Sequence, residues 1–266
     1  MSIVCDTYEP ATNGQAGIEL AGVSLRFRRY ADQTPSFRQT ILNAVLRRNY
    51  SSASEFWLYR DLNLSIAHGE RVGVIGRNGA GKTTLLKVIL GIYTPTAGRV
   101  RVRGLIAPLI ELTAGLNIEL SGWENIFLMG SLLGLSTEQM KQRAGDILRF
   151  AELEDFAGMP MKYFSAGMKM RLVFSIATGV PNEIMLMDEV FAAGDAGFIS
   201  KATDRMHELV DSSHIVVFAS HNISLVKKLT TRVIWLERGR IVADGDPASI
   251  CDDYLAHMAA EQGSRP

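Results

Sequence analysis

Gly76-Arg77-Asn78-Gly79-Ala80-Gly81-Lys82-Thr83-Thr84 follows the apolar run Val72-Gly73-Val74-Ile75 and precedes the helical pattern Leu85-Leu86-Lys87-Val88-Ile89-Leu90. This order predicts a strand, a glycine loop and a helix. Glycines let a loop bend around a phosphate chain without Cβ clashes, so that several backbone N–H groups point at one place. The helix adds its free N-terminal amides and the positive end of its dipole. The stretch therefore predicts a site for a nucleoside triphosphate.

The side chains at the end of this loop have expected roles of their own. Lys82 supplies a mobile cation for the β- and γ-phosphates, and the Thr83 hydroxyl is a ligand for Mg²⁺. The alternative is a chance glycine turn, and the strand before the loop and the helix after it argue against that alternative. The residues expected to hold the nucleotide are Gly76, Asn78, Gly79, Ala80, Gly81, Lys82, Thr83 and Thr84.

The bulk composition indicates a folded chain with a large core and no strong overall electrostatic field. Its 266 residues are 47% hydrophobic, and 28 basic residues balance 28 acidic ones. A net charge of zero does not indicate nucleic acid as the partner. Cys5 and Cys251 have no metal-ligand spacing and suggest no disulfide framework. No apolar run approaches the roughly 18 residues that a membrane span requires, so we expect a chain that does not cross a bilayer alone.

The pattern along the chain predicts an α/β fold with helical insertions. We expect a polar lead-in over 1–17, an amphipathic helix over 35–48 within an insertion spanning 31–55, and a helical subdomain over about 112–179. A C-terminal helix and tail should occupy 251–266, as the end of a helix that begins at Pro247. The expected strands are 18–30, 56–66, 99–102, 182–188, 214–220 and a hairpin over 233–243; the other expected helices are 123–134, 137–150 and 166–178.

A second acidic motif closes one of the apolar strands. Glu183-Ile184-Met185-Leu186-Met187 runs into Asp188 and Glu189. Sites in α/β sheets form at the carboxyl ends of strands, so Asp188 should reach the Mg²⁺ shell. Glu189 should point at the γ-phosphate as general base for water. Such a pair can also simply end an ordinary strand, and its occurrence together with the glycine loop favours the catalytic interpretation.

A small polar turn opens the helix expected over 166–178. Tyr163-Phe164-Ser165-Ala166-Gly167-Met168 places Ser165 and the amides after it where they could form a second phosphate site. The plainer alternative is that Ser165 is only the N-cap of a core helix.

Taken together, these motifs make the chain resemble an ABC transporter ATPase subunit over about residues 18–250. Phe164-Ser165-Ala166-Gly167-Met168 stands where that family carries Leu-Ser-Gly-Gly-Gln. Ala192-Ala193-Gly194-Asp195 resembles its D-loop, and Ser220-His221-Asn222 resembles its switch histidine. The resemblance implies a P-loop NTPase cassette with a RecA-like core, an antiparallel β subdomain and a helical insertion, using ATP and Mg²⁺.

Two departures from the general family pattern resemble one branch of it. Glu111 stands where Gln is usual, and Met168 ends the signature. Both changes are typical of exporters of O-antigen, teichoic acid and capsular polysaccharide, in which the insert over 31–55 would carry a gate helix. Glu111 is thus a candidate Mg²⁺ ligand or a contact to the membrane partner. Because the chain stops at Pro266, we expect no C-terminal carbohydrate-binding domain.

The resemblance also implies a composite site and a set of partners. Lys82 and Thr83 of one copy would be closed by Ser165 and Gly167 of another, in a head-to-tail homodimer. His221 would hold the γ-phosphate and the attacking water, and Asp195 would contact across the dimer. The homodimer would act at the cytoplasmic face of the inner membrane, bound to a pair of permease subunits that move a lipid-linked glycan, with no nucleic acid involved.

An aromatic side chain should stack on the adenine ring. Phe27, at the end of the first strand, is the first candidate, followed by Tyr30 and Trp57, although each could equally be core packing.

Two rival functions remain open at this point. The first is a soluble ABC ATPase of translation or DNA repair, which would resemble tandem cassettes or carry long coiled-coil insertions that this chain lacks. The second is a non-hydrolysing regulator with the same fold. The presence of Lys82, Asp188, Glu189 and His221 argues against that regulator.

Overall fold

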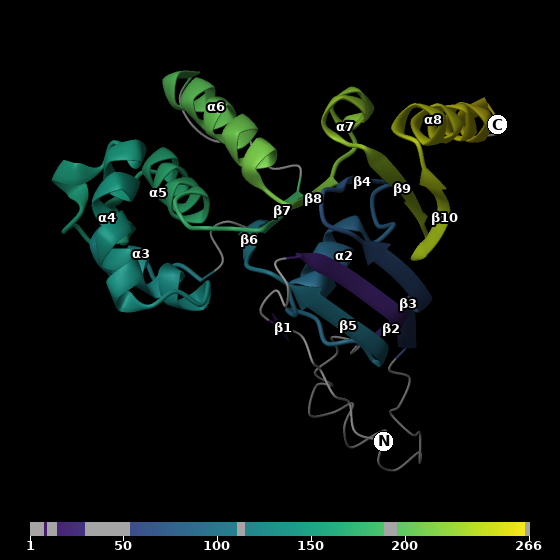
Figure 1. The fold of residues 1–266 in the computed structure, drawn as a ribbon, viewed down its shortest axis with the longest axis horizontal. Coiled ribbons are helices and arrows are strands. Elements are labelled where there is room, and N and C mark those ends of the chain that lie inside the picture. The colour runs from purple at the N-terminus through teal and green to yellow at the C-terminus, as the bar shows by residue number, and fades with distance from the viewer. Residues whose placement is uncertain (1–7, 10–14, 30–53, 111–114, 189–195, 264–266) are drawn as a thin grey trace, which may run out of the picture.

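The structure is a computed structural model, and the description below covers residues 8–9, 15–29, 54–110, 115–188 and 196–263. Two β-sheets lie one above the other, and a separate group of helices extends from one end (Figure 1). Among the described residues, no helix combines the length and the apolar content that crossing a bilayer requires.

The smaller sheet has four strands in the order β1-β5-β2-β3. Its long strands β2 and β3 pair antiparallel, and β1 pairs parallel with β5. The bounds are β1 Tyr8–Glu9, β2 Gly17–Arg29, β3 Ser54–Ile66 and β5 Ala97–Arg103.

The larger sheet has six strands in the order β10-β9-β4-β8-β7-β6, and only β10 runs antiparallel to its neighbour. The carboxyl ends of β4, β8 and β7 therefore meet at one edge. The bounds are β4 Arg71–Ile75, β6 Ile106–Leu109, β7 Ile184–Asp188, β8 Ile215–Ala219, β9 Arg232–Glu237 and β10 Arg240–Gly245.

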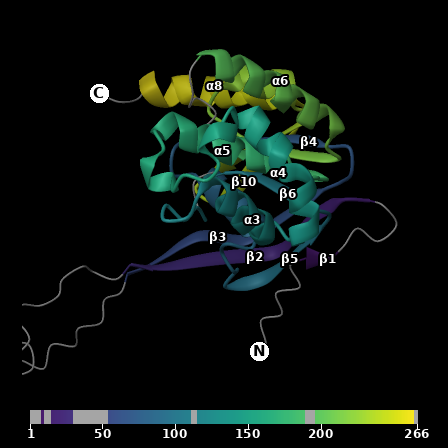
Figure 2. The same cartoon turned by 90° about the vertical axis from the view of Figure 1, so that its left-hand side faces the viewer.

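The helices divide into three groups. Helix α2 lies between the sheets, while α6, α7 and α8 cover the opposite face of the larger sheet (Figures 1 and 2). Helices α3, α4 and α5 form the extended end. The bounds are α2 Lys82–Ile89, α3 Gly122–Leu132, α4 Thr137–Ala151, α5 Ala166–Thr178, α6 Ala196–Ser212, α7 Ile223–Leu229 and α8 Pro247–Gly263.

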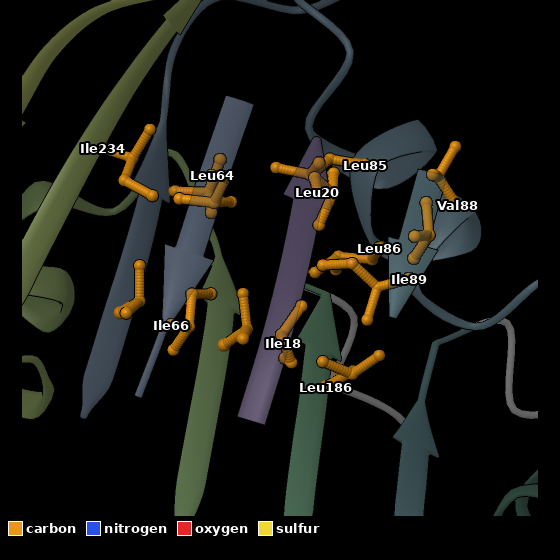
Figure 3. Close-up of a cluster of buried hydrophobic side chains, with 14 of the residues drawn as sticks. Ile18, Leu20, Leu64, Ile66, Leu85, Leu86, Val88, Ile89, Leu186 and Ile234 are labelled. Carbon is orange, nitrogen blue, oxygen red and sulfur yellow. The ribbon is translucent and has the colours of Figure 1, made fainter. Parts of the chain in front are cut away.

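The strands of the larger sheet are apolar on both faces because each face is covered. In β7, Ile184 and Leu186 enter the core around α2, whereas Met185 and Met187 enter the core under α5 to α8. Continuous apolar runs of this kind are expected of buried parallel strands. Figure 3 shows the first core, where residues of β2, β3, β7 and β9 surround the buried side chains of α2. The helix that follows the glycine loop is thereby held from both sides.

A third core lies inside the helical end of the molecule. Leu172 and Ile176 of α5 pack there against α3 and α4, while Val173 and Phe174 of the same helix pack against the larger sheet. Ser121 and Ser136 are the N-cap residues of α3 and α4. In each capping box, the side chain of Glu124 or Gln139 accepts a hydrogen bond from the backbone N–H of the capping serine. The helical end is thus a small unit joined to the sheet through α5.

The fold class expected from the sequence is confirmed, and the expected strands and helices among the described residues are present with small shifts at their ends. The sequence analysis did not predict β1, β6, α6 or α7, which the structure contains. The helix expected over 35–48 lies outside the described residues, as do most of the lead-in 1–17 and most of the insertion 31–55.

Candidate nucleotide site

The glycine loop leaves β4 and turns directly into α2. Gly79 and Gly81 have φ values of 80° and 110°, in the left-handed region that favours glycine. A Cβ on Gly79 would meet no atom within 4 Å, so the loop is open on that side. A cavity of about 320 Å³ lies there, lined by Leu58, Asn78, Gly79, Gly81, Lys82, Thr83 and Thr84.

Two contacts from distant parts of the chain hold this loop in place. The buried Tyr59 hydroxyl of β3 donates a hydrogen bond of 2.5 Å to the Gly81 carbonyl, and burial raises the pKa of Tyr59, so the hydroxyl stays protonated. From the β9–β10 turn, the Gly239 amide donates to the Ala80 carbonyl at 3.1 Å. Neither residue was predicted as part of the site, because only the fold brings them to the loop.

Lys82 lies folded over its own loop. Its Nζ donates to the carbonyl oxygens of Gly76 and Arg77, at 2.7 and 3.2 Å. Burial lowers the pKa of Lys82, and the nearby Asp188 carboxylate offsets part of this effect. The ammonium group is therefore held at the loop by uncharged carbonyl oxygens, which a phosphate can replace.

Thr83 and Asp188, the two residues expected to hold Mg²⁺, lie in contact. The Thr83 hydroxyl donates a hydrogen bond of 2.6 Å to Asp188 Oδ2, although 105 positions separate the two residues. The pair forms because β4 and β7 flank β8 in the parallel sheet, where both Val74 and Asp188 pair with Ala219. A hydroxyl and a carboxylate oxygen are ligands suited to Mg²⁺.

His221 follows the third strand of this edge. The Ser220 amide donates to the Val74 carbonyl at 3.2 Å, which fixes the end of β8 beside the start of the loop. Asn222 caps α7 by accepting a hydrogen bond from the Leu225 amide, and the His221 side chain is exposed. The predicted loop, carboxylate and histidine thus follow three adjacent strands.

Ser165 and Gly167 lie at the start of α5, in the helical end of the molecule. The Ser165 hydroxyl accepts a hydrogen bond of 3.1 Å from the Met168 amide, as an N-cap does. The Ser165 side chain is exposed, and a Cβ on Gly167 would approach only Ser165 Oγ, at 3.8 Å. Neither residue lines the cavity at the glycine loop of its own chain.

The three aromatic candidates for adenine differ in their surroundings. Phe27 is half-buried and packs edge-on against Tyr93, with ring centroids 5.4 Å apart. The guanidinium groups of Arg26 and Arg60 lie 5.4 and 5.3 Å from the centre of the Trp57 ring. The β3 residue that reaches the cavity is Leu58, which sequence reasoning did not single out. Adenine stacking on Phe27 stays a prediction, and Tyr30 lies outside the described residues.

Three further predicted site residues, Glu111, Glu189 and Asp195, also lie outside the described residues. Their proposed roles remain predictions from the sequence.

Comparison with known proteins agrees with this geometry. The profile described as ABC transporter matches residues 59–192. The O-antigen export system ATP-binding protein RfbE of Yersinia enterocolitica is 46% identical over 181 residues, which are 68% of this chain and 76% of that protein. RfbB of Myxococcus xanthus, with the same description, is 35% identical over 232 residues, or 87% of this chain. The chain spans only 53% of that second protein.

Solved structures share the fold. The ATP-binding cassette MJ0796, described as a dimer in a post-hydrolysis state with ADP and Pi, superposes with a TM-score of 0.63 at 22% identity. The superposition covers 86% of this chain and 98% of the cassette. Together with a matched profile that spans half of the sequence, these findings show that the chain belongs to the ABC transporter family.

Proposed function

We propose that this chain is the ATP-binding and ATP-hydrolysing subunit of an ABC transporter that exports a lipid-linked polysaccharide through a separate permease. The observation that carries the ATPase part is the Thr83–Asp188 hydrogen bond beside the glycine loop and Lys82. The polysaccharide part is supported by relatives described as O-antigen export proteins. Teichoic acid, capsule and galactan exporters are the alternatives within the same branch.

The residues of the site fit MgATP. The open side of Gly79 and the cavity beside it leave room for a phosphate chain next to the loop amides. Thr83 and Asp188 would hold Mg²⁺, which neutralises charge on the phosphates when bound. With ATP bound, Lys82 would exchange its carbonyl partners for phosphate oxygens. His221 would orient the attacking water and Glu189 would deprotonate it.

We propose a head-to-tail homodimer in which Ser165 and Gly167 of one copy close the site of the other. The exposure of Ser165 at the N-terminus of α5 supports this arrangement, since the helix amides there can donate hydrogen bonds to an anion. Asp195 would contact the second copy beside the same site.

The composite site can be tested by mixing two inactive variants, Lys82→Met and Ser165→Arg. Each pure variant should lose ATPase activity. In a mixed dimer, one site combines the intact Lys82 of one copy with the intact Ser165 of the other. Random pairing should therefore restore about a quarter of the wild-type turnover. A mixture that stays as inactive as its components, although mixed dimers form, would exclude the shared site.

Exposed apolar side chains on the helical end support a permease as partner. Backbone amides of Gly122, Trp123 and Lys162 donate hydrogen bonds to the carbonyl oxygens of Met159, Ala157 and Ile118, and these bonds join the segments at this end. The exposed large side chains there are Ile118, Trp123, Leu132, Phe156, Met159 and Tyr163. Large exposed apolar side chains of this kind at one end of a fold favour a protein interaction surface there.

Substitution of Trp123 should separate permease binding from ATP hydrolysis. Trp123 is 42% exposed, and Trp123→Ser should therefore leave the fold and the basal ATPase activity of the isolated subunit unchanged. The amount of permease co-purified from membranes should fall at least about tenfold. An aromatic side chain that a partner buries at the centre of an interface contributes about 2 kcal/mol or more to binding. Val242→Ser, at an exposed apolar position on β10, is the matched control. Equal recovery with both variants would place the permease elsewhere.

The proposed cargo is tested in cells that lack the chain. Lipid-linked glycan should then accumulate at the cytoplasmic face of the inner membrane, where the subunit would be bound through its permease. Re-expression of the chain should restore export of the glycan to the cell surface. Normal surface glycan without the chain, or a translation or DNA-repair defect instead, would favour the soluble rival.

A further inference from the structure

A second group of ligand-type side chains lies beside the nucleotide site. Glu237 ends strand β9, while His257 and Glu261 lie on helix α8. The two helix residues are four positions apart, so their side chains lie on the same face. That face is turned toward the end of β9.

The spacing of the three groups matches a metal-binding geometry. His257 Nε2 lies 3.8 Å from Glu237 Oε2 and 3.7 Å from Glu261 Oε1. The three ligand atoms all lie within 4.8 Å of one another. Around a tetrahedral Zn²⁺ ion with bonds of about 2.1 Å, two ligand atoms are about 3.4 Å apart. Both distances from His257 Nε2 are within a few tenths of an ångström of this spacing, so side-chain rotations of the two glutamates would bring all three groups around one ion.

The surroundings of His257 Nε2 also favour a ligand at this place. Its Nε2 atom is shielded from solvent, yet within the described part of the chain it has no hydrogen-bond partner. The ring is held against Trp235, with centroids 5.1 Å apart. A fixed imidazole whose buried nitrogen faces two carboxylates is suited to a metal ion.

The group is connected to the phosphate loop by two routes. Arg77, within the glycine loop, forms an ion pair with Glu261 through Oε2, the oxygen that does not face His257. Glu237 immediately precedes the β9–β10 turn, from which Gly239 donates to the Ala80 carbonyl. An ion held here would therefore fix α8 and the hairpin to each other beside the loop.

We propose that Glu237, His257 and Glu261 form a site for a divalent transition-metal ion of the Zn²⁺ type, with solvent as the fourth ligand. The ion would fasten the C-terminal helix to the hairpin that supports the phosphate loop. Arg77 would orient Glu261 from outside the coordination shell, as outer partners of metal ligands commonly do. This site is separate from the Thr83–Asp188 pair, and it does not depend on the proposed transport function.

The site is tested by titrating nucleotide-free protein with Zn²⁺ in the Asp188→Asn background, which weakens binding at the Thr83 site. His257→Gln and Glu237→Gln should each weaken Zn²⁺ binding more than about tenfold. His207→Gln, at an exposed histidine of α6, is the matched control and should bind as the parent does. Saturating Zn²⁺ should raise the melting temperature of the parent and of the control, but not that of the two site variants.

Co²⁺ serves as a spectroscopic probe that identifies the ligands. The parent should give the visible bands of four-coordinate Co²⁺ without a thiolate charge-transfer band, because the proposed ligands are nitrogen and oxygen. A thiolate band would place the ion on a cysteine and overturn the proposal. Equal Zn²⁺ affinity in the parent and in both site variants would also overturn it. An absence of Zn²⁺ binding in the folded parent would do the same.

Discussion

Replacing Asp188 by Asn should lower the ATP turnover of the subunit by roughly 10²- to 10³-fold while the fold is retained. The amide is nearly isosteric and can still accept a hydrogen bond from the Thr83 hydroxyl, which now lies 2.6 Å from Asp188 Oδ2. What is lost is one negative charge at the position where Mg²⁺ is expected. Turnover measured at saturating MgATP, together with nucleotide affinity, separates the loss of catalysis from the loss of binding.

The matched control for this substitution is Asp211→Asn. Asp211 pairs with Arg71 at 3.0 Å and its side chain is 75% exposed. Removing a surface charge of this kind should change neither stability nor turnover appreciably. If Asp188→Asn retained wild-type turnover, the Thr83–Asp188 pair would have no part in hydrolysis, and the proposed function would lose its main support.

Replacing Gly239 by Ala should destabilise the protein by about 3 kcal/mol or more. A Cβ at this position would lie 1.5 Å from the Leu58 carbonyl oxygen, and φ is 73°. The turn cannot move away without giving up its hydrogen bond to Ala80 in the phosphate loop. Chemical denaturation should record the loss in stability, and weakened nucleotide binding should accompany it.

Alanine substitutions at two other glycines distinguish the effect of steric contact from the effect of backbone strain. Gly134 also has a positive φ, 81°, but a Cβ there meets nothing within 4 Å, so Gly134→Ala should cost only about 1 kcal/mol. Gly145 lies within α4 with the same open space, and Gly145→Ala should stabilise the protein by about 0.5–1 kcal/mol. If Gly239→Ala cost no more than Gly134→Ala, the contact with Leu58 would be unimportant.

The sequence predicted those parts of the site that lie within one local pattern. The glycine loop, the strand that ends in Asp188 and the strand before His221 each carry a periodic or compositional signal. Because parallel strands present their carboxyl ends at one edge, the meeting of Thr83 and Asp188 also followed from the pattern.

The supports of the loop were not predictable in the same way. Tyr59 reaches Gly81 from a different sheet, and Gly239 reaches Ala80 from a hairpin far along the chain. Such contacts depend on how the layers pack, which no local pattern specifies. Helix α7 was missed for a simpler reason, since a helix of seven residues is too short to display a clear period.

The sharing of α5 between two cores has a mechanical consequence for Ser165. One face of the helix packs against the large sheet and another against α3 and α4, so a tilt of the helical end relative to the sheet would carry α5 with it. With thirteen residues the helix is about 20 Å long, and a tilt of roughly 10° about its far end displaces the tip by about 3 Å. That displacement equals the length of one hydrogen bond, so in the proposed dimer it would decide whether Ser165 reaches the nucleotide of the second copy.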